Sequence, residues 1–219
     1  MIPLLIVWLL KNLRRLKTAA KSTSIRTAQI ILAILSLTLF VRAQEITIRY
    51  NILHNGEIKG TMLMHQQING NRVHLKLESE VKTRFLIKVT VRSIEEAIFE
   101  NGIMIYSSLC RIVNGDEKIN QQIQATGRNY KFTAKNKITT LPTYPINHSI
   151  LWLYYQEPVH IDKIYSDNYQ QFVDVRKTGD NKYRVSFPNG NINYYNYKNG
   201  VCTSVEVNQF YDMQFQLVQ

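Results

Sequence analysis

Six of the nine glycines in this chain directly follow an asparagine. The pairs are Asn55-Gly56, Asn69-Gly70, Asn101-Gly102, Asn114-Gly115, Asn189-Gly190 and Asn199-Gly200. Both residue types tolerate the positive φ angles of a type I′ turn, so an Asn-Gly pair between alternating segments predicts a tight β-hairpin. We therefore expect a mainly β protein of about ten antiparallel strands, a meander that curls into a β roll or open barrel.

Matching apolar residues across each turn predicts the register of the hairpins. A two-residue loop fits Asn69-Gly70, whereas the first hairpin fits better with a three-residue loop that begins at His54. Two-residue loops at Asn189-Gly190 and Asn199-Gly200 give three C-terminal strands one shared apolar face. The predicted inner face of the sheet carries Met62, Met64, Leu75, Leu77, Val185, Phe187, Ile192 and Val205.

The two cysteines lie in the part of the chain that we expect to be exported, where the oxidising environment permits a disulfide between them. The predicted register places Cys110 on an inner face with Met104 and Tyr106, which indicates a buried structural thiol. Cys202 is predicted to pair with Tyr197 across its hairpin. Connectivity cannot be derived from spacing, so free thiols and a disulfide both remain open.

The segment between Pro145 and Pro158 interrupts the strand pattern. Ile150, Leu153 and Tyr154 recur there at helical spacing. This spacing predicts one short helix around residues 147–156. The helix is expected either to pack in the core or to close one end of the β roll.

The first 43 residues have the pattern of a secretion signal. They hold seven of the 27 basic residues and none of the 16 acidic ones, which leaves 20 basic residues in the remainder. An apolar run, residues 28–41, follows the basic stretch, and Val41 and Ala43 suit the −3 and −1 positions of a cleavage site after Ala43. A retained anchor, or an over-extended reading frame before the true start, stays open.

This pattern predicts a signal peptide over residues 1–43 and one exported β-rich domain over residues 44–219. The expected location is the periplasm or the outer cell envelope. Because most of the basic excess precedes the cleavage site, the net charge of +11 does not indicate a nucleic-acid partner.

Four segments resemble a known family. They are SEVKTRFLIKVTV, FENGIMIYSSLCRIVNGDEKIN, LYYQEPVHIDKIYSDNYQQF and YRVSFPNGNINYYNYKNGVCTSVEV. They are similar to a family of exported β-rich proteins common in Bacteroidota, the domain of unknown function 6134, over nearly all of residues 45–218. The resemblance implies secretion by a signal peptide, a single β-rich domain and no assigned activity, and it carries over no catalytic residues.

Two groups of residues are candidates for binding. The predicted register sets His65 directly opposite His74, and two imidazoles at that spacing can hold zinc or copper. The alternative is a solvated histidine pair beside basic neighbours. In the other group, an outer strip of Tyr195 and Tyr197, with Arg184 across from Tyr195, can stack on sugars or peptides.

Catalytic motifs are absent from the sequence: it has no G-x-S-x-G, H-E-x-x-H, C-x-x-C or phosphate-binding glycine loop. Carboxylate pairs occur at Glu78 with Glu80 and at Glu95 with Glu96. Neighbours on a strand point to opposite faces, so Glu95 and Glu96 cannot share a site, whereas Glu78 and Glu80 share a face that we expect to be solvent-exposed.

These observations favour a non-catalytic secreted or cell-envelope protein. We expect it to bind an apolar or amphiphilic ligand, such as a lipid, between the curved sheet and the helix near Trp152, with no cofactor. One alternative is a secreted hydrolase with scattered catalytic residues, which a polar cluster with perturbed ionisation inside a deep pocket would favour. The other alternative is a small outer-membrane β-barrel, which charges on both strand faces make less favourable.

Overall fold

The computed structural model describes residues 44–84, 88–135, 137–142, 145–208 and 213–218. By its internal contacts the chain divides into two units, Met1–Arg42 and Ala43–Gln219. The predicted signal peptide lies outside the described residues. Within the described ranges, no helix has the length and apolarity that a membrane crossing requires.

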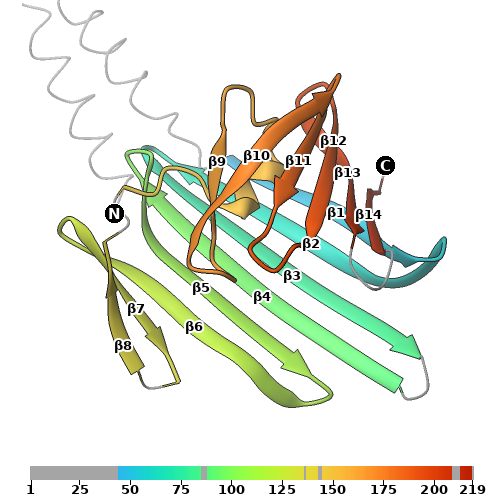
Figure 1. The fold of residues 1–219 in the computed structure, drawn as a ribbon, viewed down its shortest axis with the longest axis horizontal. Helices are drawn as coiled ribbons and strands as arrows, with labels where there is room; N and C mark the ends of the chain where they lie inside the picture. The colour runs from blue at the N-terminus through green and yellow to red at the C-terminus, as the bar shows by residue number, and fades with distance from the viewer. Residues whose placement is uncertain (1–43, 85–87, 136, 143–144, 209–212, 219) are drawn as a thin grey trace, which may run out of the picture. The chain divides into compact units, whose positions relative to one another are not determined.

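The described residues form fourteen strands in a single antiparallel sheet (Figure 1). The strands are β1 Gln44–His54, β2 Glu57–Asn69, β3 Arg72–Arg84, β4 Lys88–Glu100, β5 Ile103–Val113, β6 Asp116–Thr126, β7 Asn129–Ala134, β8 Lys137–Leu141, β9 Lys163–Ser166, β10 Gln171–Gly179, β11 Lys182–Ser186, β12 Ile192–Lys198, β13 Val201–Asn208 and β14 Met213–Leu217. The predicted meander is confirmed, but the expectation of about ten strands was too low because several short strands have no Asn-Gly turn beside them.

The sheet has two halves that meet at one seam. Its order runs from β8 back to β1, and β14 then follows β1 and leads back to β9. At the seam Tyr50 pairs with Leu217 and Ile52 pairs with Phe215. The N-terminal half and the C-terminal half of the domain are therefore joined by the pairing of β1 with β14.

Residues 146–149 lie between strands β5 and β9 and connect them. The backbone N–H of Met104 donates to the carbonyl of Ile146 at 2.8 Å, and the N–H of Tyr165 donates to the carbonyl of His148 at 3.0 Å. Ser149 also forms a parallel bridge with Tyr165. The edge strand β9 therefore has backbone hydrogen bonds on its outer side, which an open sheet edge lacks. This closure confirms the predicted roll or open barrel.

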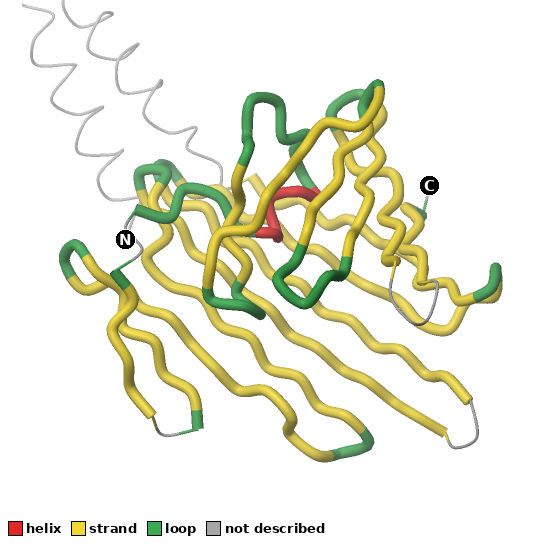
Figure 2. The backbone as a smooth tube through the Cα atoms, viewed as in Figure 1, coloured by secondary structure: helices red, strands yellow, loops and turns green. Residues whose placement is uncertain are grey.

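The short helix is a 3-10 turn, η2, over Ile150–Tyr154, drawn in red in Figure 2. It contacts β3, β9 and β13, and most of its side chains are buried. Its carbonyl groups are satisfied from the sheet: the Tyr197 hydroxyl donates to the Leu153 carbonyl at 2.7 Å. The Tyr50 hydroxyl reaches the Tyr154 carbonyl at 3.4 Å and the Cys202 carbonyl at 2.8 Å. The turn is thus part of the core, and buried tyrosines hold it there.

The core lies on the inner face of the sheet. Six of the residues predicted for this face are buried, and Phe187 is partly buried against them. The prediction for Ile192 is wrong: it is three residues from the buried Tyr195 on the same strand and therefore lies on the outer face. The largest buried side chains are aromatic and include Tyr50, Tyr130, Tyr165, Tyr195 and Phe99. The abundance of tyrosine therefore follows largely from the core, where a hydroxyl can meet a backbone carbonyl.

Four Asn-Gly pairs form two-residue turns, including the first hairpin, for which we expected a three-residue loop from His54. Asn55, Asn101, Asn114 and Asn199 have φ between 50° and 53°, and the glycine after each also has a positive φ. Each pair forms the two central residues of a hairpin. Positive φ at both positions is the type I′ geometry that the sequence predicts.

The predicted register at Asn69-Gly70 is wrong by two residues. Asn69 pairs with Arg72, so the loop consists of Gly70 and Asn71. Only Gly70 has a positive φ, as in a type II′ turn. An even shift keeps every side chain on its predicted face but changes its partner, and His65 consequently lies opposite Lys76.

The predicted register at Asn189-Gly190 is wrong by one residue. The loop has three residues, Pro188 to Gly190, because the Phe187 N–H donates to the Asn191 carbonyl at 2.9 Å and Ser186 pairs with Ile192. Proline suits the second position of a type I turn, and Gly190, at φ 85°, takes the left-handed position that ends it. An odd shift exchanges the two faces, so Tyr195 points inward.

Irregularities near the tight turns explain the remaining errors in register. The pairing shifts at Ile52/Leu53, Ile98/Phe99, Arg111/Ile112 and Asn196/Tyr197. In the first hairpin the shift replaces the three-residue loop that we expected from His54. A bulge adds one residue to a strand and thereby turns the following side chains to the other face.

Gly60 lies at the first of these irregularities, opposite Ile52 and beside β3. A Cβ atom at Gly60 would lie 2.1 Å from the Glu80 carbonyl oxygen and 2.8 Å from the Val81 Cα. Only glycine therefore fits this close approach of two backbones.

Among the predictions for the cysteines, the inward orientation of Cys110 is wrong. Both are free thiols, so the disulfide does not form in this structure. Cys202 is buried, and burial raises the pKa of its thiol to about 12. Cys110 is only partly buried, and it pairs with the exposed Ile94 on the outer face of the sheet. The bulge at Arg111/Ile112 turns it away from the inner face on which we expected it.

Candidate functional site

A cavity of about 530 Å³ lies on the inner face of the sheet. Its volume is in the range of about 300 to 1,000 Å³ that is typical of small-molecule sites. Strands from both halves of the sheet contribute to its walls. The apolar part of the wall includes Ile52, Leu77, Val81, Val91, Val207 and Phe215.

One part of the cavity is polar. Ser93 and Glu95 come from β4, Arg111 comes from β5, and Asp167 directly follows β9. The Arg111 guanidinium donates from Nε to Ser93 Oγ at 3.0 Å, and its Nη2 lies 3.7 Å from Glu95 Oε1. The connecting segment 146–149 ties β9 to β5 and so brings Asp167 to this group.

Asp167 is held in place by hydrogen bonds from two strands, β5 and β6. The Ser107 hydroxyl of β5 donates to its carboxyl group at 2.5 Å, and Gln121 of β6 donates to its backbone carbonyl at 2.6 Å. The side chain is 8% exposed. Burial raises the pKa of Asp167 to about 7, the charge of Glu95 adds to the rise, and the Ser107 hydrogen bond opposes it. Asp167 is therefore a carboxyl group that can change its charge near neutral pH.

Glu95 is the second carboxyl group of the cavity. Its side chain is 24% exposed, and burial raises its pKa while the neighbouring Arg111 opposes the rise. Burial raises the pKa values of Tyr154 and Tyr195, which line the same cavity, and the charge of Glu95 adds to both rises. Glu95 is thus close enough to influence both Asp167 and the two cavity tyrosines electrostatically.

The polar and apolar parts follow one another along the strands. Glu95 pairs with Leu77, and further along the same two strands Val91 pairs with Val81 and Val89 with Thr83. At about 3.3 Å per residue, the six residues from Glu95 to Val89 extend over about 20 Å. The cavity therefore has a carboxyl-lined end and a longer apolar end.

The predicted tyrosine strip is wrong in its orientation. Tyr195 and Tyr197 are buried on the inner face, and Arg184 lies on the outer face opposite Tyr194. Tyr195 does line the cavity, whereas Tyr197 is bound to η2. The Pro188 loop and the Asn196/Tyr197 bulge together account for this difference.

Trp152 does not line the cavity among the described residues. Its ring packs edge-on against Phe99 at a centroid distance of 5.5 Å and against His148 at 6.2 Å. Trp152 is itself part of η2, and its contact with Phe99 packs η2 against β4.

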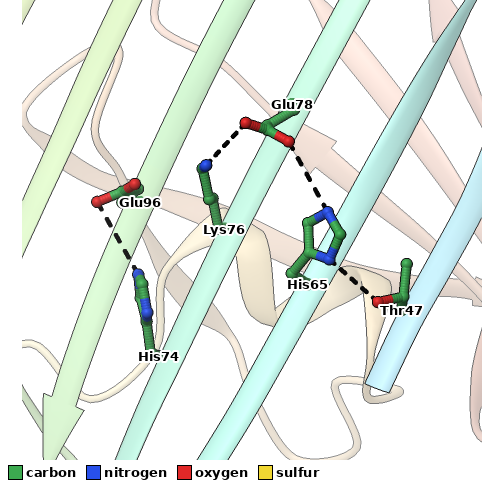
Figure 3. A network of polar contacts seen from close by, with 6 residues as sticks. All are labelled: Thr47, His65, His74, Lys76, Glu78 and Glu96. Atoms are coloured by element: carbon green, nitrogen blue, oxygen red, sulfur yellow. Dashed lines mark hydrogen bonds and ion pairs between the residues drawn. The ribbon is translucent and has the colours of Figure 1, made fainter. Parts of the chain in front are cut away.

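The predicted opposition of His65 and His74 is also wrong. The two imidazoles lie on neighbouring strands of the outer face and contact different partners (Figure 3). His65 Nδ1 lies 3.0 Å from the Thr47 hydroxyl and its Nε2 lies 3.8 Å from Glu78, while His74 Nε2 lies 3.9 Å from Glu96. The described residues contain no group of three or more side chains suited to a metal ion.

The two carboxylate pairs lie on the faces predicted for them, but the sequence did not predict that Glu95 would share a cavity with Asp167. Glu78 and Glu80 share the outer face and contact lysines, while Glu95 points inward and Glu96 outward. The partner of Glu95 in the cavity is Asp167, far along the chain. No local spacing could have joined them, because only the curling of the sheet brings β9 to β5.

These features define a β-barrel-like domain made from one long antiparallel sheet with a ligand-sized cavity on its inner face. The chain belongs to the family described as Domain of unknown function (DUF6134), whose sequence model matches residues 50–218. No curated protein matches the chain.

A solved structure has a similar fold. It is the crystal structure of a β-barrel-like protein of the domain of unknown function DUF1849 from Brucella abortus. The two chains are 10% identical with a TM-score of 0.51, and the match covers 82% of this chain and 98% of that chain. At this identity the likeness shows the fold alone.

Proposed function

We propose that this domain binds an amphiphilic small molecule in its inner cavity, without acting on it. One observation carries the proposal: the cavity of about 530 Å³ has mostly apolar residues along its length, and its carboxyl groups lie at one end. An alkyl tail gains by leaving water, at roughly 25 cal/mol per Å² of buried apolar surface. The polar groups would fix the orientation of the head group.

We also propose that the domain acts outside the cytoplasm, in the periplasm or the outer cell envelope. The support is the composition of residues 1–43, with basic residues before an apolar run and small residues before the expected cleavage site. Such a location would bring the domain close to membrane lipids and other amphiphiles.

Isothermal titration with dodecanol tests the binding function. Val91→Phe would fill the apolar end, and we expect it to weaken binding by about tenfold, equivalent to about 1.4 kcal/mol. Arg92→Phe, which adds the same ring on the outer face of β4, is the matched control and should leave binding unchanged. Equal affinities for all three proteins would place any binding elsewhere and refute the proposal.

A hydrolase is the second candidate function, because Glu95 and Asp167 share a cavity and both have raised pKa values. Such a pair can supply an acid and a base. Assays with ester and glycoside substrates test this candidate. Turnover that disappears in Asp167→Asn would establish it, and turnover that persists in that variant would exclude these residues as its source.

A further inference from the structure

The polar end of the cavity has more hydrogen-bond acceptors than donors. Arg111 already uses Nε on Ser93 and lies beside Glu95. Asp167 accepts from Ser107 and from its own backbone amide, although a carboxylate has about four acceptor positions. A ligand that brings donors would therefore find partners here.

Asn193 adds a further acceptor to this wall. Its side chain lines the cavity, and its Oδ1 atom is buried without a hydrogen-bond partner. An unsatisfied buried carbonyl oxygen costs about 1 to 3 kcal/mol. A donor on a bound molecule is one way in which this atom would be satisfied.

The charges at this end do not balance. Two carboxyl groups, Glu95 and Asp167, face one guanidinium, that of Arg111. The other basic residues on the cavity wall, His54 and Lys59, belong to the β1–β2 hairpin at the apolar end, and Lys59 is already paired with Glu57. A buried carboxylate without a counter-charge is unfavourable, and a cation beside it restores the balance.

We propose that the carboxyl-lined end selects an amphiphile with a protonated primary amine as its head group. The ammonium group would lie between Glu95 and Asp167 and donate to both, while its alkyl chain follows the apolar strands toward Val91 and Val81. This inference rests on the proposed binding function and adds the chemistry of the ligand.

Binding should depend on pH through the groups around Asp167. Its carboxyl group faces Ser107 of β5, the carboxyl group of Glu95 on β4 and the neutral Tyr165 hydroxyl on β9, and Gln121 of β6 holds its backbone. An amine keeps its charge at neutral pH, since its pKa is about 10. Acidification would protonate Asp167 and remove half of the carboxylate charge that attracts it.

Titration with dodecylamine, dodecanol and dodecanoate tests the inference, because the three molecules share a chain and differ in head group. We expect dodecylamine to bind wild-type protein at least about tenfold more tightly than dodecanol at about pH 8, with a smaller difference below about pH 6. Dodecanoate should bind most weakly.

The variants Asp167→Asn and Glu95→Gln should each reduce the ratio of dodecylamine affinity to dodecanol affinity to about threefold or less. Glu96→Gln, on the outer face of the same strand, is the matched control and should keep the preference. Circular dichroism would confirm that each variant is folded.

The outcomes separate the two proposals. If dodecanol binds but dodecylamine binds no better, or if Asp167→Asn keeps the preference, the amine inference is wrong and the binding function stands. If none of the three molecules binds, the binding function itself is refuted, and the amine inference with it.

Discussion

Replacing Asp167 by asparagine should make the protein more stable at neutral and alkaline pH. In the folded protein the pKa of Asp167 rises from its ordinary 3.8 to about 7, because burial penalises the charged form. The folded state therefore holds the proton more tightly than the unfolded chain does. The stability that this group contributes is complete below about pH 4 and is lost as the pH rises through about 7.

The size of the effect follows from the two pKa values. The difference is about three, and each tenfold change in proton affinity is worth about 1.4 kcal/mol, so the charged carboxylate costs about 4 kcal/mol at pH 8. Asparagine has nearly the shape of the protonated acid and carries no charge. The variant should thus match wild type near pH 4 and exceed it by up to about 4 kcal/mol near pH 8.

Urea unfolding at a series of pH values measures this difference. Other carboxylates change the absolute stability with pH, since lysines lower the pKa values of Glu57, Glu78 and Glu80 in the folded state. Subtracting wild type from Asp167→Asn removes their shared contribution. Asp180→Asn, at an exposed turn, controls for the loss of one charge. A difference that stays flat from about pH 4 to 8 would refute the assignment of Asp167 as a buried titrating acid.

Three further predictions concern the fold. Gly60→Ala should destabilise the protein by about 1 to 3 kcal/mol or more, because its Cβ would clash with the Glu80 carbonyl of β3. Gly179→Ala is the control, since its Cβ would make only ordinary contacts. Thermal unfolding compares the two variants, and equal losses of stability would contradict the close approach at Gly60. Tyr197→Phe should cost about 1 to 3 kcal/mol by leaving a buried η2 carbonyl unpaired, and a loss below about 0.5 kcal/mol in urea unfolding would count against that hydrogen bond. Iodoacetamide should modify Cys110 but spare Cys202 in the folded protein, and peptide mapping that finds both modified, or a disulfide, would overturn this.

The fold class was predictable because its strongest determinants are local. Asparagine and glycine reach positive φ at little cost, so the positions of four turns follow directly from the pairs. The register was less predictable, because a bulge shifts a strand by one residue without a clear mark in the sequence. The loop at Pro188 is different, because a proline there favours a three-residue loop from Pro188 to Gly190. With that loop, Tyr195 would have been expected on the inner face.

The candidate site was much less predictable than the fold. Glu95 was recognised as one of a carboxylate pair, but its neighbour in sequence lies on the other side of the sheet. Its neighbour in space, Asp167, comes from the far edge strand. Hairpin turns predict contacts between consecutive strands. They do not predict which distant strands come together when the sheet curls, as β9 and β5 do here.

The seam between β1 and β14 also sets the order in which the domain can be completed. Apart from the pairing of β1 with β14, strands β1 to β8 pair only with their sequence neighbours and can form while the chain is still being synthesised. Their apolar face then has no cover until the second half arrives, and β14, the last described strand, must join β1 before the two halves become one sheet. A chain that ends before β14 would leave the apolar face of β1 to β8 exposed to other molecules. Completion of the domain therefore depends on the pairing of β1 with β14, which joins strands far apart in the sequence.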